Sequence, residues 1–136
     1  MTKTVLDKLG FKSGMTGWAR HVPDDVASII PFKTQAPVNK PDIIVAFIKT
    51  AGDVPGTLEA VVAHYERGKS LWFAYPKKTG SIKTDLSRDH GWEPLVGKDL
   101  LPVTQVAIDS TWSALRFRYR DEIVSLKRRS DLPGKK

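Results

Sequence analysis

Leu71-Trp-Phe-Ala-Tyr-Pro-Lys-Lys78 holds five consecutive apolar residues, three of them aromatic, followed by a proline and two lysines. A short apolar run without alternation is typical of a strand buried on both faces, as in the centre of a parallel sheet. Pro76 and the lysines mark the point where this strand ends in a loop. Because ligands of open α/β sheets bind outside the carboxyl ends of the strands, Lys77 and Lys78 are candidate site residues. Their charge favours a negatively charged ligand or partner.

A second buried strand and a connecting helix are predicted upstream of this stretch. Asp42–Ile48 is another continuous apolar run. Between the two strands, Pro55 suits the first turn of a helix and Gly68 suits its C-terminal cap. His64 lies off the apolar stripe of that helix and is expected to face solvent. The stripe has the helical spacing i, i+3, i+4 and i+7, and consists of Leu58, Val61, Val62 and Tyr65.

The amino-terminal part of the chain predicts weaker elements. Val5–Leu9 is expected to form a short helix ended by a glycine, and Met15–Val22 a strand. Asp24–Ile30 is expected to be a short helix with acidic residues at its amino end, as the helix dipole prefers. After the lysines, Thr84 or Asp85 is expected to cap a short, interrupted helix.

The carboxyl-terminal part predicts a β-hairpin. Its arms are Val103–Ile108 and Trp112–Arg120, joined by a turn at Asp109–Thr111. In the second arm apolar and basic residues alternate, which is typical of a strand with one buried and one solvated face. The solvated basic face consists of Arg116, Arg118 and Arg120.

These elements predict an α/β fold, a three-layer Rossmann-like sheet that is parallel in the centre and ends in an antiparallel hairpin. We expect residues 1–120 to form a single domain and residues 121–136 a basic tail. The element order is similar to that of the later half of a nucleotide-fold methyltransferase. The glycine-rich cofactor turn of such folds is absent, because the first strand is followed by His21–Asp25, which has no glycine and two carboxylates. We therefore expect no cofactor.

Composition excludes several classes of protein. The 136-residue chain has no cysteine, and its three histidines share no metal-binding spacing, which argues against thiolate or histidine metal sites. No apolar run approaches the roughly 20 residues of a membrane span, and the amino end lacks a signal-peptide core. We expect a cytoplasmic protein.

Net charge is +7, and it is concentrated at the carboxyl end. Residues 116–136 carry eight Lys/Arg against three Asp/Glu, whereas the first 115 carry fourteen against twelve. A basic end can bind nucleic acid or acidic proteins. A solvated strand face followed by a frayed tail explains the same pattern and is the preferred interpretation.

Four blocks of sequence carry a resemblance to a family of small bacterial α/β proteins of unknown function. The resemblance covers nearly the whole chain up to Arg120 and implies an α/β fold and a bacterial cytoplasmic origin, with no established activity. The stretch from His90 to Gly97 departs from the family pattern, which has an unbroken helix there. The blocks are Lys8–Gly14, Leu71–Lys78, Thr84–Leu86 and Ile108–Phe117.

The candidate site has both a functional and a structural interpretation. Lys77, Lys78, Asp85, Asp109 and Trp112 can meet at one edge of the sheet and bind an anion or a partner. Alternatively, Asp85 caps a helix, Asp109 shapes the hairpin turn and Trp112 covers the sheet edge. The structural interpretation is preferred, and no residue pattern pairs a nucleophile with a general base, so the sequence leans against an enzyme.

Three functional hypotheses follow. The first is a non-catalytic, regulatory or protein-binding module that uses the basic strand or the Lys77–Lys78 edge. The second is a domain that binds an anionic metabolite or nucleotide at the carboxyl-terminal edge of the sheet. The third, less favoured, is nucleic-acid binding through the arginine face and tail. A pocket walled by Lys77, Lys78, Asp85 and Trp112 would favour the second hypothesis, and a flat surface there the first.

Overall fold

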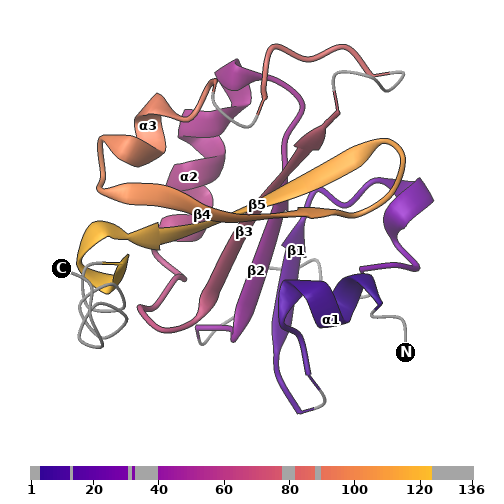
Figure 1. Cartoon of the computed structure of the whole chain (residues 1–136), viewed down its shortest axis with the longest axis horizontal. Helices are drawn as coiled ribbons and strands as arrows, with labels where there is room; N and C mark the ends of the chain where they lie inside the picture. The colour runs from indigo at the N-terminus through magenta and orange to yellow at the C-terminus, as the bar shows by residue number, and fades with distance from the viewer. Residues whose placement is uncertain are drawn as a thin grey trace, which may run out of the picture.

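The computed structural model of the chain describes residues 4–12, 14–30, 32, 40–77, 82–87 and 90–123. A five-stranded sheet with the order β1-β2-β3-β5-β4 forms its centre (Figure 1). β1, β2 and β3 are parallel, and β5 pairs antiparallel with both β3 and β4. The strands are β1 (Gly17–Arg20), β2 (Ile43–Phe47), β3 (Ser70–Pro76), β4 (Leu100–Ala107) and β5 (Trp112–Tyr119).

The two continuous apolar runs are the central parallel strands, as predicted. Every residue of β2 is buried, and in β3 only the first residue, Ser70, is partly exposed. Phe73, in the middle of β3, is fully buried and packs edge-on against Phe117 with ring centroids 5.6 Å apart. Both faces of these strands are apolar because helices or loops cover both sides of the sheet.

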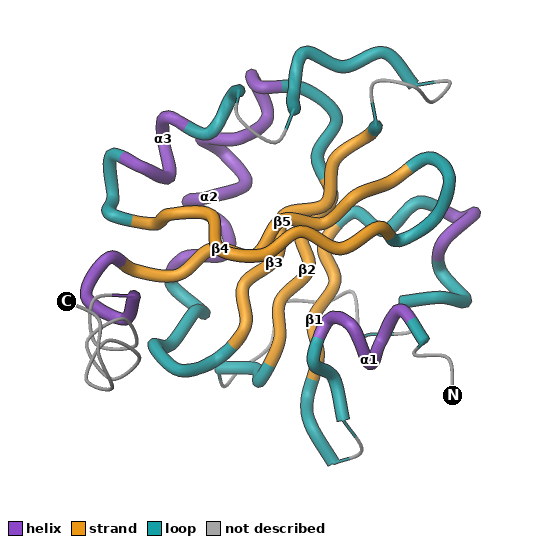
Figure 2. Tube along the Cα trace, viewed as in Figure 1, coloured by secondary structure: helices purple, strands orange, loops and turns teal. Residues whose placement is uncertain are grey.

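The helices form a layer on each face of the sheet. α2 (Val54–Val62) and α3 (Glu93–Val96) lie on one side, and α1 (Val5–Leu9) lies on the other, as Figures 1 and 2 show. α1 is held to the centre of the sheet because the Trp72 indole Nε1 donates a hydrogen bond to the Leu9 carbonyl at 3.2 Å. The predicted three-layer α/β architecture is confirmed.

The connecting helix is shorter than predicted. α2 ends at Val62 with Ala63 as its cap, and Gly68 instead adopts a left-handed turn (φ +92°) before β3. Tyr65 lies beyond the helix but is still buried. The expectation that His64 faces solvent is wrong, because its ring is partly buried and packs edge-on against Trp18 at 5.0 Å.

Other predicted boundaries change for local reasons. β1 ends at Arg20 because His21 takes a positive φ of 59°. The predicted helix at Asp24–Ile30 is a single 3₁₀ turn, η1 (Asp24–Val26). The residues near Thr84 form no helix, since the Thr84 hydroxyl accepts a hydrogen bond from the Leu86 N–H at 3.0 Å in a local turn.

The hairpin is present, with a longer first arm than predicted. β4 begins at Leu100 rather than Val103, and its register shifts between Pro102 and Thr104. That irregularity and the missing N–H of Pro102 suit an edge strand, where unpaired backbone must be kept from pairing with other chains. In the part of the chain that the structure describes, no helix is long and apolar enough to cross a membrane.

Candidate functional site

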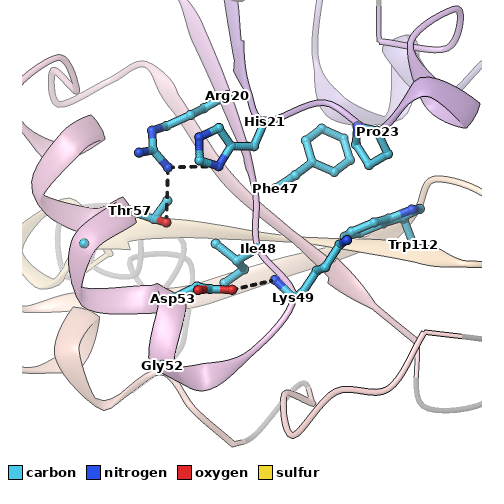
Figure 3. A pocket seen from close by; sticks show the side chains of 11 residues that line it. Arg20, His21, Pro23, Phe47, Ile48, Lys49, Gly52, Asp53, Thr57 and Trp112 are labelled. Atoms are coloured by element: carbon cyan, nitrogen blue, oxygen red, sulfur yellow. Dashed lines mark hydrogen bonds between the residues drawn. The ribbon is translucent and has the colours of Figure 1, made fainter.

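A cavity of about 560 Å³ opens at the carboxyl ends of β1 and β2 (Figure 3). Two sides of the cavity are formed by the strand ends, at Arg20 and Phe47, and by the residues that follow each strand. The third side is the connection from β2 into α2, which contains the 3₁₀ turn η2 (Ala51–Asp53) and the first turn of the helix. The lining residues are Arg20, His21, Pro23, Phe47, Ile48, Lys49, Gly52, Asp53, Gly56, Thr57 and Trp112.

Two cations lie on the cavity wall. The Arg20 guanidinium donates a hydrogen bond to the Thr57 hydroxyl at 3.3 Å and lies 3.4 Å from His21 Nδ1 (Figure 3). Lys49 is exposed and lies two residues after the end of β2. Among the described residues, neither Arg20 nor Lys49 forms an ion pair. Their charges are therefore available to a ligand.

Asp53 is the only carboxylate among the described residues that line the cavity, and it already binds the backbone. Oδ2 of Asp53 accepts hydrogen bonds from the N–H groups of Lys49 and Thr50, at 3.4 and 3.3 Å. This arrangement fixes the loop between β2 and α2. Among the described residues that line the cavity, one carboxylate thus lies opposite two cations.

The amino end of α2 faces the cavity at Gly56, which has no side chain. The N-cap of α2 is Asp53, whose side chain does not cap the helix, and the first turn holds no acidic residue. Gly56 lines the cavity, and a Cβ placed on it would meet no atom within 4 Å. The positive end of the helix dipole thus adds to the two cations.

The opposite wall is aromatic. Phe47 and Trp112 pack edge-on with ring centroids 5.2 Å apart, and Pro23 lies beside them (Figure 3). Trp112 is 1% exposed, and its indole Nε1 is buried without a hydrogen-bond partner. The cavity therefore combines a cationic side with a flat apolar side.

The residues predicted to form one site do not lie together, and they have different roles. Trp112 lines the cavity, but Lys77 and Asp85 do not, and Lys78 lies outside the described residues. Asp109 Oδ1 accepts hydrogen bonds from the N–H groups of Thr111 and Trp112, at 2.8 and 2.7 Å, and so shapes the hairpin turn.

Asp85 and Lys77 make structural contacts that differ from those predicted. Asp85 accepts a hydrogen bond from the Ala51 N–H at 2.7 Å, at the start of η2, rather than capping the helix expected after it. The Lys77 N–H donates to the Thr111 carbonyl at 2.7 Å, which extends the pairing of β3 with the hairpin.

The basic strand face is less solvated than predicted. Arg116 and Arg118 are partly buried, and in each the Nε atom is buried without a hydrogen-bond partner. Burial and the neighbouring Arg118 lower the pKa of Arg116. Only Arg120 is exposed, and it lies 3.5 Å from Asp99. The prediction of a continuous wet face is wrong, because the loop before β3 covers part of it: the Lys69 carbonyl accepts a hydrogen bond from Arg116.

Sequence reasoning missed most of the cavity residues. Arg20 ends β1 and Lys49 lies two residues after β2, so the rule that makes Lys77 a candidate applies equally to both. His21 lies in the turn whose lack of glycine argued against a cofactor, and its sequence position alone did not mark it as a cavity residue. In the described part of the chain, no three His, Asp or Glu side chains gather to hold a metal ion.

Comparisons with known proteins agree on the fold. No family model matches the chain, and no curated protein matches it by sequence. A SAM-dependent methyltransferase from Aquifex aeolicus is similar in structure, with a TM-score of 0.53 and 13% identity over 83% of this chain and 86% of that one.

Two other solved structures show a comparable likeness. A B. subtilis tRNA methyltransferase gives a TM-score of 0.51 at 9% identity, over 93% of this chain and 70% of that one. A protein of the NADB-Rossmann superfamily from Streptococcus agalactiae gives 0.50 at 9% identity, over 88% and 69%. At this level of identity the likeness concerns architecture alone: the chain has a methyltransferase-like Rossmann fold.

Proposed function

We propose that this chain is a small-molecule-binding domain whose ligand carries a phosphate group and a flat apolar part. The observation that carries the proposal is the cavity at the carboxyl ends of β1 and β2, where Arg20 and Lys49 have no carboxylate partner among the described residues. A mononucleotide is one ligand with both parts.

The size and position of the cavity support this proposal. Pockets for small ligands typically measure about 300–1,000 Å³, and this one measures about 560 Å³. It lies at the edge of the sheet where open α/β folds place their ligands. Its walls differ from those of the pocket expected from the sequence, since of Lys77, Asp85 and Trp112 only Trp112 lines it.

The two sides of the cavity suggest how such a ligand would lie. The anionic group would sit near Arg20, Lys49 and the amino end of α2, because charge-assisted hydrogen bonds there are stronger than neutral ones. The flat part would lie beside Phe47 and Trp112. These residues are 3% and 1% exposed, so they would contact it only through the small part of each ring that is accessible.

We propose binding without catalysis. The Thr57 hydroxyl accepts a hydrogen bond from Arg20. Because Arg20 donates to this oxygen and does not remove its proton, Arg20 does not activate Thr57 as a nucleophile. His21 Nδ1 also lies beside Arg20 rather than beside a hydroxyl group. A regulatory role, in which the bound ligand alters contacts with a partner protein, is compatible with this proposal.

The test is direct binding of pyrophosphate, AMP and adenosine, measured by isothermal titration calorimetry and by ligand-induced change in Tm. We expect AMP and pyrophosphate to bind and adenosine to bind more weakly. Lys49→Gln should weaken AMP binding about tenfold, the effect of losing one charge-assisted contact. Rising salt should weaken binding to the wild type more than to this variant.

Two further variants separate charge from shape. Lys98→Gln removes an exposed cation that does not line the cavity, so it should leave affinity unchanged. Gly56→Leu places a side chain where the cavity is open, so it should block binding while circular dichroism stays unchanged. Equal affinity of wild type, Lys49→Gln and Gly56→Leu for AMP would refute the proposed site.

A further inference from the structure

We infer that this cavity excludes S-adenosyl-methionine, although the fold is that of methyltransferases. Three independent features carry the inference: the backbone turn after β1, the absence of a carboxylate for the ribose, and the sign of the cavity's charge. The exclusion stands whether or not the proposed anion binds.

The turn after β1 differs from the cofactor-binding turn of nucleotide folds. Nucleotide folds place glycines in this turn so that the backbone can approach the ligand. Here the turn begins with His21 in a left-handed conformation (φ 59°), which costs energy in any residue with a side chain. The side chains of His21 and Pro23 line the cavity where glycines would leave space. A cofactor seated as in those folds would collide with them.

The chain also lacks the acidic residue that would hold a ribose. In dinucleotide-binding folds, an Asp or Glu about 20 residues after the glycine turn binds the ribose hydroxyls. From Val26 to Pro41 this sequence has no acidic residue, and the next one is Asp42. β1 is the edge strand of the sheet, so in the described part of the chain no strand beyond it supplies a substitute.

Asp42 lies at the wrong end of the sheet to replace that residue. It precedes β2, whereas the cavity lies beyond the carboxyl end of the same strand. Its carboxylate is also occupied, since Oδ1 accepts from Lys69 Nζ at 2.7 Å and Oδ2 accepts from the Thr16 N–H at 2.9 Å. The hydrogen bond from Lys69, followed by that from Thr16, lowers the pKa of Asp42.

Charge opposes the cofactor as well. The sulfonium of S-adenosyl-methionine is a permanent cation. Among the described lining residues, Arg20 and Lys49 would face it with Asp53 as the only counter-charge. Size does not explain the exclusion, because a volume of about 560 Å³ is ample for a ligand of this kind. Failure to bind can therefore be assigned to backbone and charge.

The experiment compares S-adenosyl-methionine, S-adenosyl-homocysteine and pyrophosphate on the full-length chain by calorimetry and by change in Tm. S-adenosyl-homocysteine lacks the sulfonium charge, so it isolates the backbone and ribose arguments. AMP has the same adenosine but also carries a phosphate for Arg20 and Lys49, so its expected binding depends on that phosphate and not on a ribose contact. We expect neither adenosyl compound to give heat or a Tm change at about 1 mM, the limit of weak binding. Pyrophosphate should bind and should lose about tenfold in affinity in Lys49→Gln.

The outcomes separate the inference from the proposed function. Binding of S-adenosyl-methionine with a Kd below about 100 µM, and its displacement by pyrophosphate, would overturn the inference. Absence of pyrophosphate and AMP binding would overturn the proposed function and leave the exclusion intact. Gly56→Leu serves as the blocked-cavity control for any adenosyl compound that does bind.

Discussion

Replacing Glu122 by glutamine should destabilise the fold, although this residue lies after the last strand. Its side chain is only 6% exposed. Oε2 accepts hydrogen bonds from the Tyr65 hydroxyl at 2.8 Å and from the Tyr119 N–H at 2.7 Å. Oε1 accepts from the Gly68 N–H at 2.9 Å and lies 3.7 Å from Arg118 Nε. Glu122 thus joins the end of β5 to the loop between α2 and β3.

The expected cost follows from this geometry. Glutamine keeps one acceptor oxygen and replaces the other with an NH₂ group, which cannot accept from any of these donors. If the remaining oxygen faces Tyr65 and Tyr119, the bond from Gly68 and the pairing with Arg118 are lost. A hydrogen bond to a charged group contributes about 1.5–3 kcal/mol, so we expect a loss of about 2–3 kcal/mol. For a chain of this size that lowers Tm by roughly 6–12 °C.

The same site predicts a pH dependence. Burial raises the pKa of Glu122, but the hydrogen bonds from Gly68, Tyr119 and Tyr65 and the charge of Arg118 outweigh it, so the net pKa is lowered from 4.5. A carboxyl group with a lowered folded-state pKa contributes its full stability above the unfolded value and loses it as pH falls through the folded one. The contribution should therefore be complete above about pH 4.5 and decline below it.

Urea unfolding followed by tryptophan fluorescence, at pH 7 and at about pH 3, measures both effects. The difference between wild type and Glu122→Gln should be large at pH 7 and smaller at the acidic pH. Glu66→Gln, an exposed carboxyl change in the loop that Glu122 contacts, is the matched control and should be nearly neutral. A Glu122→Gln variant within about 0.5 kcal/mol of wild type at pH 7 would refute the reasoning.

Four further outcomes are expected. Phe73→Ala, at a fully buried ring, should cost about 3–5 kcal/mol in urea unfolding; a cost near 1 kcal/mol would contradict its central position. Deleting residues 130–136, which lie outside the described residues, should leave Tm almost unchanged. Ending the chain after Arg120 should lower Tm, because this truncation removes Glu122. Equal Tm values for the two truncations would contradict this prediction. Lys77→Ala combined with Lys78→Ala should leave the chain folded and weaken AMP binding less than Lys49→Gln does; the reverse order of affinities would move the site to the end of β3. Asp53→Asn should tighten pyrophosphate binding a few-fold, because it removes the only carboxylate among the described lining residues and keeps an acceptor for the backbone N–H groups. Weaker binding would show that the negative charge of Asp53 has another role.

Side-chain patterns along the chain predicted the buried strands well, but they predicted the ends of helices and the exposure of strand faces poorly. Leu71–Tyr75 and Ile43–Ile48 could be assigned because a strand covered on both faces needs an unbroken apolar run, and that requirement is visible in any window of sequence. The end of α2 could not, because Gly68 suits a helix cap and a left-handed turn equally well. Similarly, the alternation in β5 predicted a solvated arginine face, and only the folded loop before β3 shows that Arg116 is partly covered.

The candidate site shows the same division. By itself the sequence determined the α/β class, the central strands, the hairpin and the absence of a glycine-rich cofactor turn, because each depends on residues that are neighbours in the chain. Only the tertiary structure decided which strand ends meet around a cavity. Arg20, Lys49, Thr57 and Trp112 come from four separate segments, and the order of the strands and the position of α2 bring them together. Sequence shows which groups follow a strand, but the distances between groups on different strands exist only once the sheet has formed.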